Sequence, residues 1–313
     1  MVHTAKYYAD LENDMIGFLE RKFKTVISLI NENIDLEIFK AVKFNFHKSM
    51  GIWRFYLKVD FIKLLGKSEI EKSDYEEIEE KLKIIVLKIL GEKALEIELI
   101  LIRLDYRKDI KVSKEERRIL LKIYKKGKKT SKFKEKHTKY ETTIYYSNKS
   151  MSVTIYDKEE ERKCKGECIE EYEENVLRLE VRLQARHLNG QKRRKKREKT
   201  LKSYLDEELF NEYIDKNAFP VFYRGNHYKI NKIEELLINN KVKRKDINNI
   251  IRFLTQISHH GYENAINLKD EEGNALLTPY KIRKYIKLLE GLDINPFIIP
   301  MREHIDMIQN KFC

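Results

Sequence analysis

Apolar and polar residues alternate along several segments of the chain, a pattern that suits a β-strand with one buried face. Every second residue is apolar over residues 53–61, and residues 42–47 repeat the pattern. Only residues 48–52, with Gly51 among them, separate the two segments. We therefore expect these segments to form an antiparallel hairpin.

Other segments extend this hairpin into a sheet accompanied by helices. Further strands are expected at residues 97–106, 140–146, 151–156 and 176–183. The spacing of apolar residues predicts a helix over residues 73–90, and Ser113 with Glu116 forms the capping box of a helix that continues to Tyr124. Later helices are expected at 201–216, 231–239, 245–258 and 279–289. The fold class predicted is α+β, a largely antiparallel sheet with helices on one face, followed by a mainly helical C-terminal domain.

The composition changes near residue 195, where we place a domain boundary. The densest basic run covers residues 192–199, and all four prolines follow it, from Pro220 onward. The chain is thus divided into residues 1–195 and 196–313. The later helices have basic faces that suit a helix-turn-helix-like DNA reader, and an ordinary helical subdomain with solvated lysines would look the same.

The charge balance indicates a class of partner. Lysine and arginine number 64 against 51 acids, which gives a formal charge of +13 and favours a polyanion such as nucleic acid. Lysines on solvated faces would give the same composition. There is no uncharged apolar run of the roughly 18 residues that a membrane span needs. The first residues lack the pattern of a signal peptide and cysteines number only three, so we expect a cytoplasmic protein with no membrane partner.

The alternation also predicts which polar side chains share a face of the sheet. Met151, Val153 and Ile155 are apolar, so the opposite face holds Ser152, Thr154, Tyr156 and Lys158. The same reasoning groups Arg103 with Asp105, Arg178 with Glu180 and Arg182, Lys43 with Asn45 and His47, and Glu141 with Thr143 and Tyr145. Acids and histidine suit a hard divalent cation, arginine suits phosphate, and tyrosine can act as a nucleophile. A merely solvated face would have a similar composition.

Four of these segments resemble rolling-circle replication initiators of plasmids and phages. The similarity lies in residues 102–106, 140–146, 152–163 and 177–183, and it covers roughly residues 97–185. It is greatest to the plasmid Rep-trans type and to related phage and plasmid replication proteins. The resemblance implies a fold related to the HUH endonucleases and a metal-dependent reaction that nicks and rejoins DNA.

The resemblance also implies residue roles. The family's nucleophile is the tyrosine of an Ile-Tyr-Asn/Asp-Lys segment, which falls on Tyr156, and Lys158 would stabilise the phenolate or the pentacovalent phosphate. The chain contains no His-x-His pair. Either acids and one histidine hold the metal, or the metal and the chemistry have been lost. In the first case Mg²⁺ or Mn²⁺ would be bound by members of one set: Asp105, Glu180, His47 and Glu141. DNA contacts are expected from Arg103, Arg162, Arg178, Arg182, Lys192, Arg193 and Arg194.

On this interpretation the chain initiates replication at a plasmid or phage origin. Attack by Tyr156 would leave a 5′-phosphotyrosine link and a free 3′-hydroxyl primer, with residues 1–195 catalytic and residues 196–313 recognising the origin. Expected partners are origin DNA, a host helicase and a second copy of the chain. A mobilisation relaxase, or an inactive DNA-binding regulator on the same scaffold, would fit the same residues. An RNA-binding protein would instead display base-stacking aromatic residues on its sheet.

Overall fold

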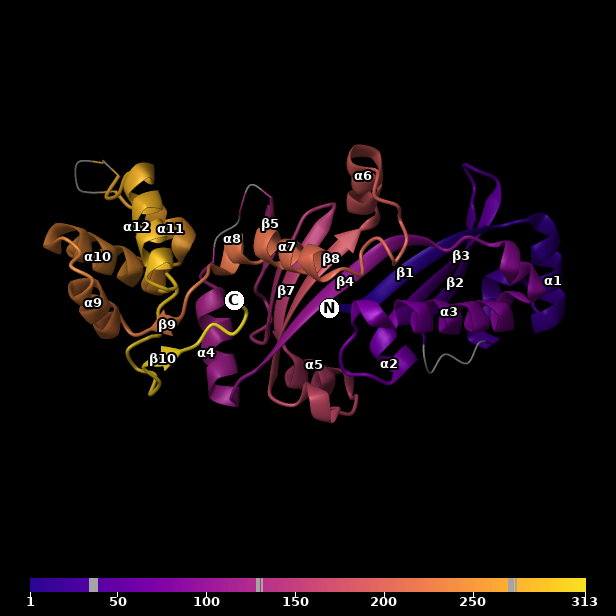
Figure 1. Ribbon diagram of the computed structural model, residues 1–313, viewed down its shortest axis with the longest axis horizontal. Coiled ribbons are helices and arrows are strands. Elements are labelled where there is room, and N and C mark those ends of the chain that lie inside the picture. The colour runs from indigo at the N-terminus through magenta and orange to yellow at the C-terminus, as the bar shows by residue number, and fades with distance from the viewer. Residues whose placement is uncertain (34–38, 128–129, 131, 270–272, 274) are drawn as a thin grey trace. The chain divides into compact units, whose positions relative to one another are not determined.

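A computed structural model describes residues 1–33, 39–127, 130, 132–269, 273 and 275–313 (Figure 1). The chain packs into two compact units. Unit 1 comprises Met1–Arg107, Lys149–Met151 and Glu180–Tyr213, and unit 2 comprises Lys108–Asn148, Ser152–Leu179 and Ile214–Cys313. No helix among the described residues is long and apolar enough to cross a membrane. The predicted division at residue 195 stays a prediction, and that residue is the last of a helix that sequence analysis missed, α6 (Ala185–Lys195).

Eight strands form one sheet in the order β2-β3-β1-β4-β8-β7-β6-β5. They are β1 (Val2–Leu11), β2 (Phe39–His47), β3 (Ile52–Asp60), β4 (Ile100–Lys111), β5 (Glu135–His137), β6 (Thr143–Ser147), β7 (Met151–Asp157) and β8 (Val176–Gln184). The pairs β2–β3, β3–β1, β1–β4, β5–β6 and β6–β7 are antiparallel. The predicted fold class, an α+β protein with a largely antiparallel sheet and a helical C-terminal region, is confirmed.

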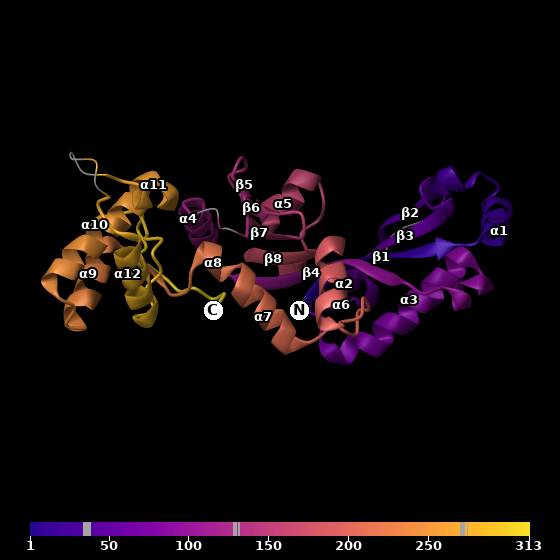
Figure 2. The ribbon, with the colours of Figure 1, turned by 90° about the horizontal axis from the view of Figure 1, so that it is seen from above.

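The predicted hairpin is the β2–β3 pair, in which Phe46 lies opposite Trp53. Phe55, Leu57 and Val59 of β3 are fully buried, as the alternation required. They share the core of unit 1 with helices α1 (Asn13–Phe23), α2 (Phe61–Leu65) and α3 (Tyr75–Leu90). Figures 1 and 2 show α3 running alongside these strands. The other face of β1, β2 and β3 is partly open to solvent.

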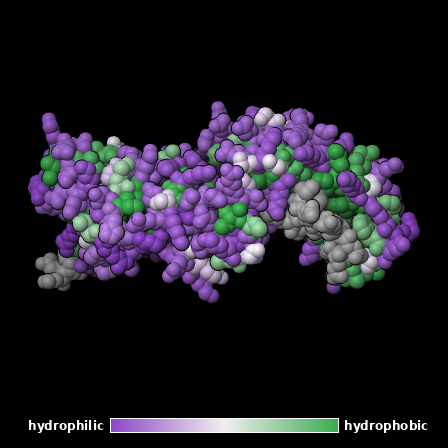
Figure 3. Space-filling model, turned by 90° about the horizontal axis from the view of Figure 1, so that it is seen from below, coloured by the Kyte–Doolittle hydropathy of each residue, from purple (hydrophilic) through white to green (hydrophobic). Residues whose placement is uncertain are grey.

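Hydrophilic side chains cover most of the face seen from below in Figure 3. Hydrophobic ones gather over the part of unit 1 that holds its N-terminal strands and α1. The exposed apolar residues of this part of the sequence include Val26 and Leu29, at 54% and 48% exposure.

Helix α4 (Lys114–Tyr124) begins with the predicted capping box, in which the Ser113 hydroxyl accepts from the Glu116 N–H at 3.2 Å. Between β7 and β8 lies a short helix, α5 (Lys158–Lys165), that sequence analysis missed. The later helices are α7 (Glu207–Asn217), α8 (Phe219–Phe222), α9 (Ile230–Asn239), α10 (Arg244–His260), α11 (Tyr262–Ile266) and α12 (Pro279–Gly291). A two-stranded sheet, β9 (His227–Tyr228) and β10 (Met307–Ile308), completes unit 2.

The helix predicted over residues 201–216 was placed too early. It begins only at Glu207, because the Asp206 carboxylate accepts from the Leu209 N–H at 3.1 Å and so caps the helix there. The other three predicted C-terminal helices are confirmed as α9, α10 and α12.

Candidate active site

The junction between β7 and α5 holds the predicted nucleophile. Tyr156 is the penultimate residue of β7, lies opposite Thr143 of β6 and is 8% exposed. The next residue, Asp157, ends the strand and caps α5: its Oδ1 accepts from the Glu159 and Glu160 N–H groups at 3.0 and 3.2 Å. The backbone after Tyr156 is therefore fixed by the helix that it starts.

A buried arginine fixes the same junction. Arg117 of α4 is 1% exposed, and its Nε donates to Asp157 Oδ2 at 2.8 Å. Its Nη2 donates to Glu159 Oε2 at 3.0 Å, and its Nη1 donates to the Val112 carbonyl at 2.9 Å. One guanidinium therefore pairs with both acids at the start of α5 and connects them to α4.

Lys158, the first residue of α5, is buried and lies two residues after the predicted nucleophile. Its Nζ donates to Glu161 Oε2 at 2.6 Å and lies 3.4 Å from Glu173 Oε1. Desolvation is the main cause that lowers the pKa of Lys158 to about 7, and the nearby Arg178 charge lowers it further against the opposing effect of Glu173. A lysine with this pKa can give or take a proton near neutral pH.

This burial predicts a pH dependence of stability. The folded-state pKa of Lys158, about 7, lies below that of an unfolded lysine, about 10.4, so between these values the unfolded chain binds more protons. We expect the free energy of unfolding to rise as the pH increases through this window. Lys158→Met should flatten the rise, whereas Lys163→Met, on the exposed side of α5, should not. Urea denaturation at about pH 6.5 and about pH 9.5 tests this, and identical pH dependence in wild type and Lys158→Met would contradict it.

Two arginines predicted to contact DNA bind carboxylates of the protein itself instead. The Arg178 side chain is fully buried and donates to both oxygens of Asp109, at 2.8 and 2.9 Å. This prediction is wrong, because no phosphate can reach a fully buried guanidinium. Arg162 is also engaged within the protein, since its Nε and Nη2 each donate at 2.7 Å to the buried Glu173 carboxylate.

Asp105, the first predicted metal ligand, lies on β4 between two guanidinium groups. Arg182 Nε and Nη2 donate to its two oxygens at 3.0 and 3.2 Å. Arg103 Nε donates to Oδ1 at 2.9 Å, and Arg103 Nη2 donates to Oδ2. Both arginines remain partly exposed, so they can still face a phosphate. The carboxylate of Asp105 is already neutralised in this arrangement.

Glu180, the second predicted ligand, faces a residue that sequence analysis missed. His3 of β1 lies with Nδ1 3.4 Å from Glu180 Oε1 and with Nε2 3.5 Å from Asp60 Oδ2. All three residues are at most 8% exposed. The alternation of residues 4–11 marks β1 as a strand, but it breaks at Val2 and gives no signal that His3 would face Glu180.

The remaining predicted ligands lie elsewhere. His47 Nε2 and the Tyr56 hydroxyl form a hydrogen bond of 2.7 Å at the β2–β3 pair. Glu141 is exposed in the turn before β6, whereas the prediction placed it on the strand itself. Within the described ranges, no group of three His, Cys, Asp or Glu side chains is arranged to hold a metal ion. The four predicted ligands therefore do not converge.

A pair of donors nevertheless suits a magnesium-like ion. Among the described residues, the buried Nδ1 of His3 has no hydrogen-bond partner, and it faces the Glu180 carboxylate. Mg²⁺ keeps several waters and binds through one or two carboxylates together with substrate phosphates. Glu180 supplies such a carboxylate, and His3 Nδ1 lies beside it as a nitrogen donor.

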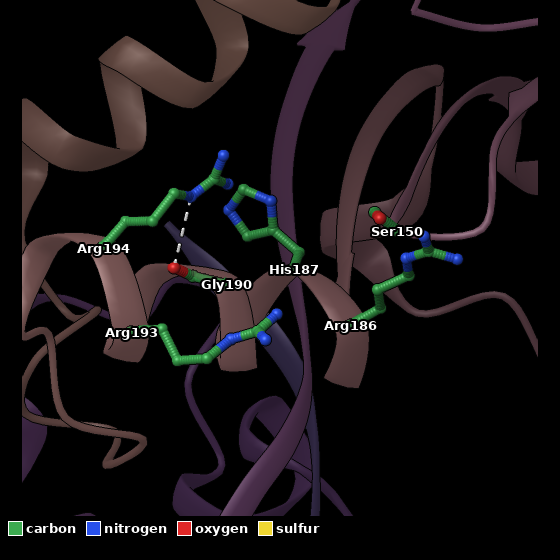
Figure 4. A pocket seen from close by; sticks show the side chains of 6 residues that line it. All are labelled: Ser150, Arg186, His187, Gly190, Arg193 and Arg194. Carbon is green, nitrogen blue, oxygen red and sulfur yellow. Dashed lines mark hydrogen bonds between the residues drawn. The ribbon is translucent and has the colours of Figure 1, made fainter.

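Helix α6 carries a pocket of about 400 Å³ rich in arginine (Figure 4). It is lined by Ser150, Arg186, His187, Gly190, Arg193 and Arg194. His187 Nε2 forms a 2.7 Å hydrogen bond with the Tyr213 hydroxyl, and Arg194 Nε donates to the Gly190 carbonyl at 3.4 Å. These lining residues include no acid, so the pocket suits a phosphate group. Lys192 lies outside it and pairs with Glu198 at 2.8 Å.

Comparison with known families adds to this geometry. Residues 73–202 match the Phage CRI family model, which describes the N-terminal part of a replication-associated protein. The match agrees with the resemblance of residues 97–185 to rolling-circle replication initiators. The matched segment contains the β7–α5 junction, Asp105, Glu180 and the α6 pocket, whereas His3 and the β2–β3 pair lie before it. No curated protein matches the sequence.

Proposed function

We propose that this protein initiates rolling-circle replication by nicking one strand of a plasmid or phage origin with Tyr156. The observation that supports it most is the family match over residues 73–202, which spans the junction where Tyr156 and Lys158 lie two residues apart. The Arg117 contacts that fix this junction give a nucleophile a defined position.

The proposed reaction conserves the energy of the phosphodiester bond. The Tyr156 oxygen bonds to the scissile phosphorus, and the bond from phosphorus to the 3′-oxygen breaks. The phenol proton, whose pKa is about 10 in a free tyrosine, passes to a base, and the leaving 3′-oxygen gains a proton. Lys158 is suited to this exchange because its pKa of about 7 supplies both the neutral and the charged form. The phosphotyrosine link keeps the energy needed for rejoining.

We include Mg²⁺ or Mn²⁺ in the proposal, held by Glu180 and His3. A divalent cation held there would offset the negative charge of a bound phosphate. The buried Nδ1 of His3 beside the Glu180 carboxylate supports this choice of residues.

Two basic surfaces support binding of the origin. Arg186, Arg193 and Arg194 around the α6 pocket can contact backbone phosphates. In unit 2, α12 exposes Lys281, Arg283, Lys284 and Lys287, which suit duplex DNA recognition by the C-terminal helices.

The test uses supercoiled plasmid carrying the origin of the parent element. With Mg²⁺ or Mn²⁺ we expect open-circular and relaxed products, and with EDTA we expect none. The same plasmid without the origin is the control for site specificity. Nicking that persists in EDTA would exclude the metal. Origin binding without nicking in either metal would favour the inactive regulator, which the neutralised Asp105 also favours.

A further inference from the structure

The partly open face of β1, β2 and β3 in unit 1 carries an unusual combination of side chains. The strand register places Tyr8 opposite Tyr56, Lys6 opposite Lys58 and Asp10 opposite Arg54. On the other side of β3, Lys43 lies opposite Tyr56. Lys6 also lies opposite Arg103 of β4, so the face continues onto that strand. We call Lys6, Tyr8, Lys43, Arg54, Tyr56 and Lys58 the tyrosine face.

Aromatic rings and cations alternate on the tyrosine face. The rings of Tyr8 and Tyr56 have centroids 6.2 Å apart. Lys6 Nζ lies 4.9 Å from the Tyr56 centroid, and Arg54 Cζ lies 4.6 Å from the Tyr8 centroid. Lys199, from the segment after α6, approaches the Tyr8 ring at 5.8 Å. His47 holds the Tyr56 hydroxyl through its 2.7 Å hydrogen bond.

Part of the positive charge of the tyrosine face has no acidic partner among the described residues. Asp10 pairs with Arg54 at 2.6 Å, but Lys6, Lys43 and Lys199 form no ion pair with a described residue. After desolvation, the charges of Arg103 and Lys43 are the next causes that lower the pKa of Lys6. These cations repel one another and surround two partly exposed rings. The tyrosine face therefore favours a ligand that is both anionic and aromatic.

We propose that the tyrosine face binds a single strand of DNA, stacking bases on Tyr8 and Tyr56 while the surrounding cations contact its phosphates. Base stacking on aromatic rings combined with basic side chains along the backbone is the chemistry of single-strand binding. Duplex DNA does not fit, because its paired bases are stacked inside the helix and cannot lie on a ring. The proposal rests on the proposed function, which separates one strand from its complement.

The test measures affinity for a fluorescent oligothymidine by anisotropy. We expect Tyr8→Ala and Tyr56→Ala each to weaken binding by about 5-fold to about 100-fold, as the loss of a base-stacking ring does. Tyr56→Phe should retain most of the affinity because it keeps the ring. Phe46→Ala is the matched control: it removes a 47% exposed ring from the same hairpin, on the opposite face of β2.

Lysine variants test the charges without removing a ring. Lys6→Gln and Lys43→Gln should each reduce the slope of log affinity against log salt concentration by about 0.7, the value for one phosphate contact with a single strand. Lys63→Gln, exposed on α2, should leave the slope unchanged. Thermal denaturation of each variant shows whether it is folded.

The outcomes separate this proposal from the proposed function. Unchanged single-strand affinity in both alanine variants, or an equal loss of affinity in Phe46→Ala, overturns the proposal that the tyrosine face binds single-stranded DNA. A higher affinity for duplex or for oligouridine than for oligothymidine overturns it as well. If the tyrosine variants lose single-strand affinity but the wild type never nicks a plasmid, single-strand binding by the tyrosine face is supported and the proposed nicking function is excluded.

Discussion

Tyr156→Phe is expected to abolish the covalent protein–DNA adduct and to leave affinity for origin DNA within a few fold. Phenylalanine keeps the ring, and therefore the packing at the end of β7, but it removes the only atom that could attack phosphorus. The measurement is a labelled oligonucleotide containing the nick site, incubated with protein and Mn²⁺ and then separated on a denaturing gel.

Tyr145→Phe is the matched control, because Tyr145 lies on the neighbouring strand opposite Thr154. It should form the adduct at the wild-type level. An undiminished adduct in Tyr156→Phe would exclude Tyr156 as the nucleophile. Because Tyr156 is only 8% exposed, the proposal also requires that DNA binding uncover its hydroxyl. Tetranitromethane should therefore nitrate Tyr156 faster when DNA is bound than when it is absent.

Arg117→Ala is expected to destabilise the protein by about 3–5 kcal/mol. The substitution leaves the carboxylates of Asp157 and Glu159 without their buried partner. Arg118→Ala, one residue along α4, is the matched control. Arg118 is 56% exposed and shares Glu303 with Lys122, so its loss should cost less than about 1 kcal/mol.

Urea denaturation followed by circular dichroism gives both free energies of unfolding. Equal losses in the two variants would show that the Arg117 contacts do not stabilise the junction. Arg117→Lys should fall between wild type and Arg117→Ala, because an ammonium group cannot reach four acceptors in different directions as the guanidinium does.

Sequence patterns predicted those helices and strands that are determined by residues close together in the chain. The hairpin follows from alternation around Gly51, and α4 follows from a capping box. Strand β4 was predicted to end at residue 106 but continues to Lys111. The charged residues of β4 after Tyr106 find partners that are distant in the sequence. Asp109 pairs with Arg178 of β8, and Arg107 donates to the Ser68 carbonyl. No local pattern in the sequence predicts pairing between residues so far apart.

The candidate site was predictable in part for the same reason. Alternation correctly placed Asp105 and Arg182 on one face, where they meet. It did not show that two arginines would neutralise that acid, or that His3 would reach Glu180 from the other end of the sequence. A ligand set depends on which strands become neighbours, and strand order is not encoded in the spacing of any single segment.

Strands β4 and β8 each contribute residues to both compact units: β4 passes from one to the other after Arg107, and β8 passes after Leu179. Cutting the chain at either place would sever a strand in mid-length and leave two unpaired ends. We therefore expect that neither unit folds as an excised fragment, and a truncation meant to isolate the proposed nicking reaction should keep β4 and β8 whole. In hydrogen exchange, the amides of these two strands should open together, as a single cooperative block.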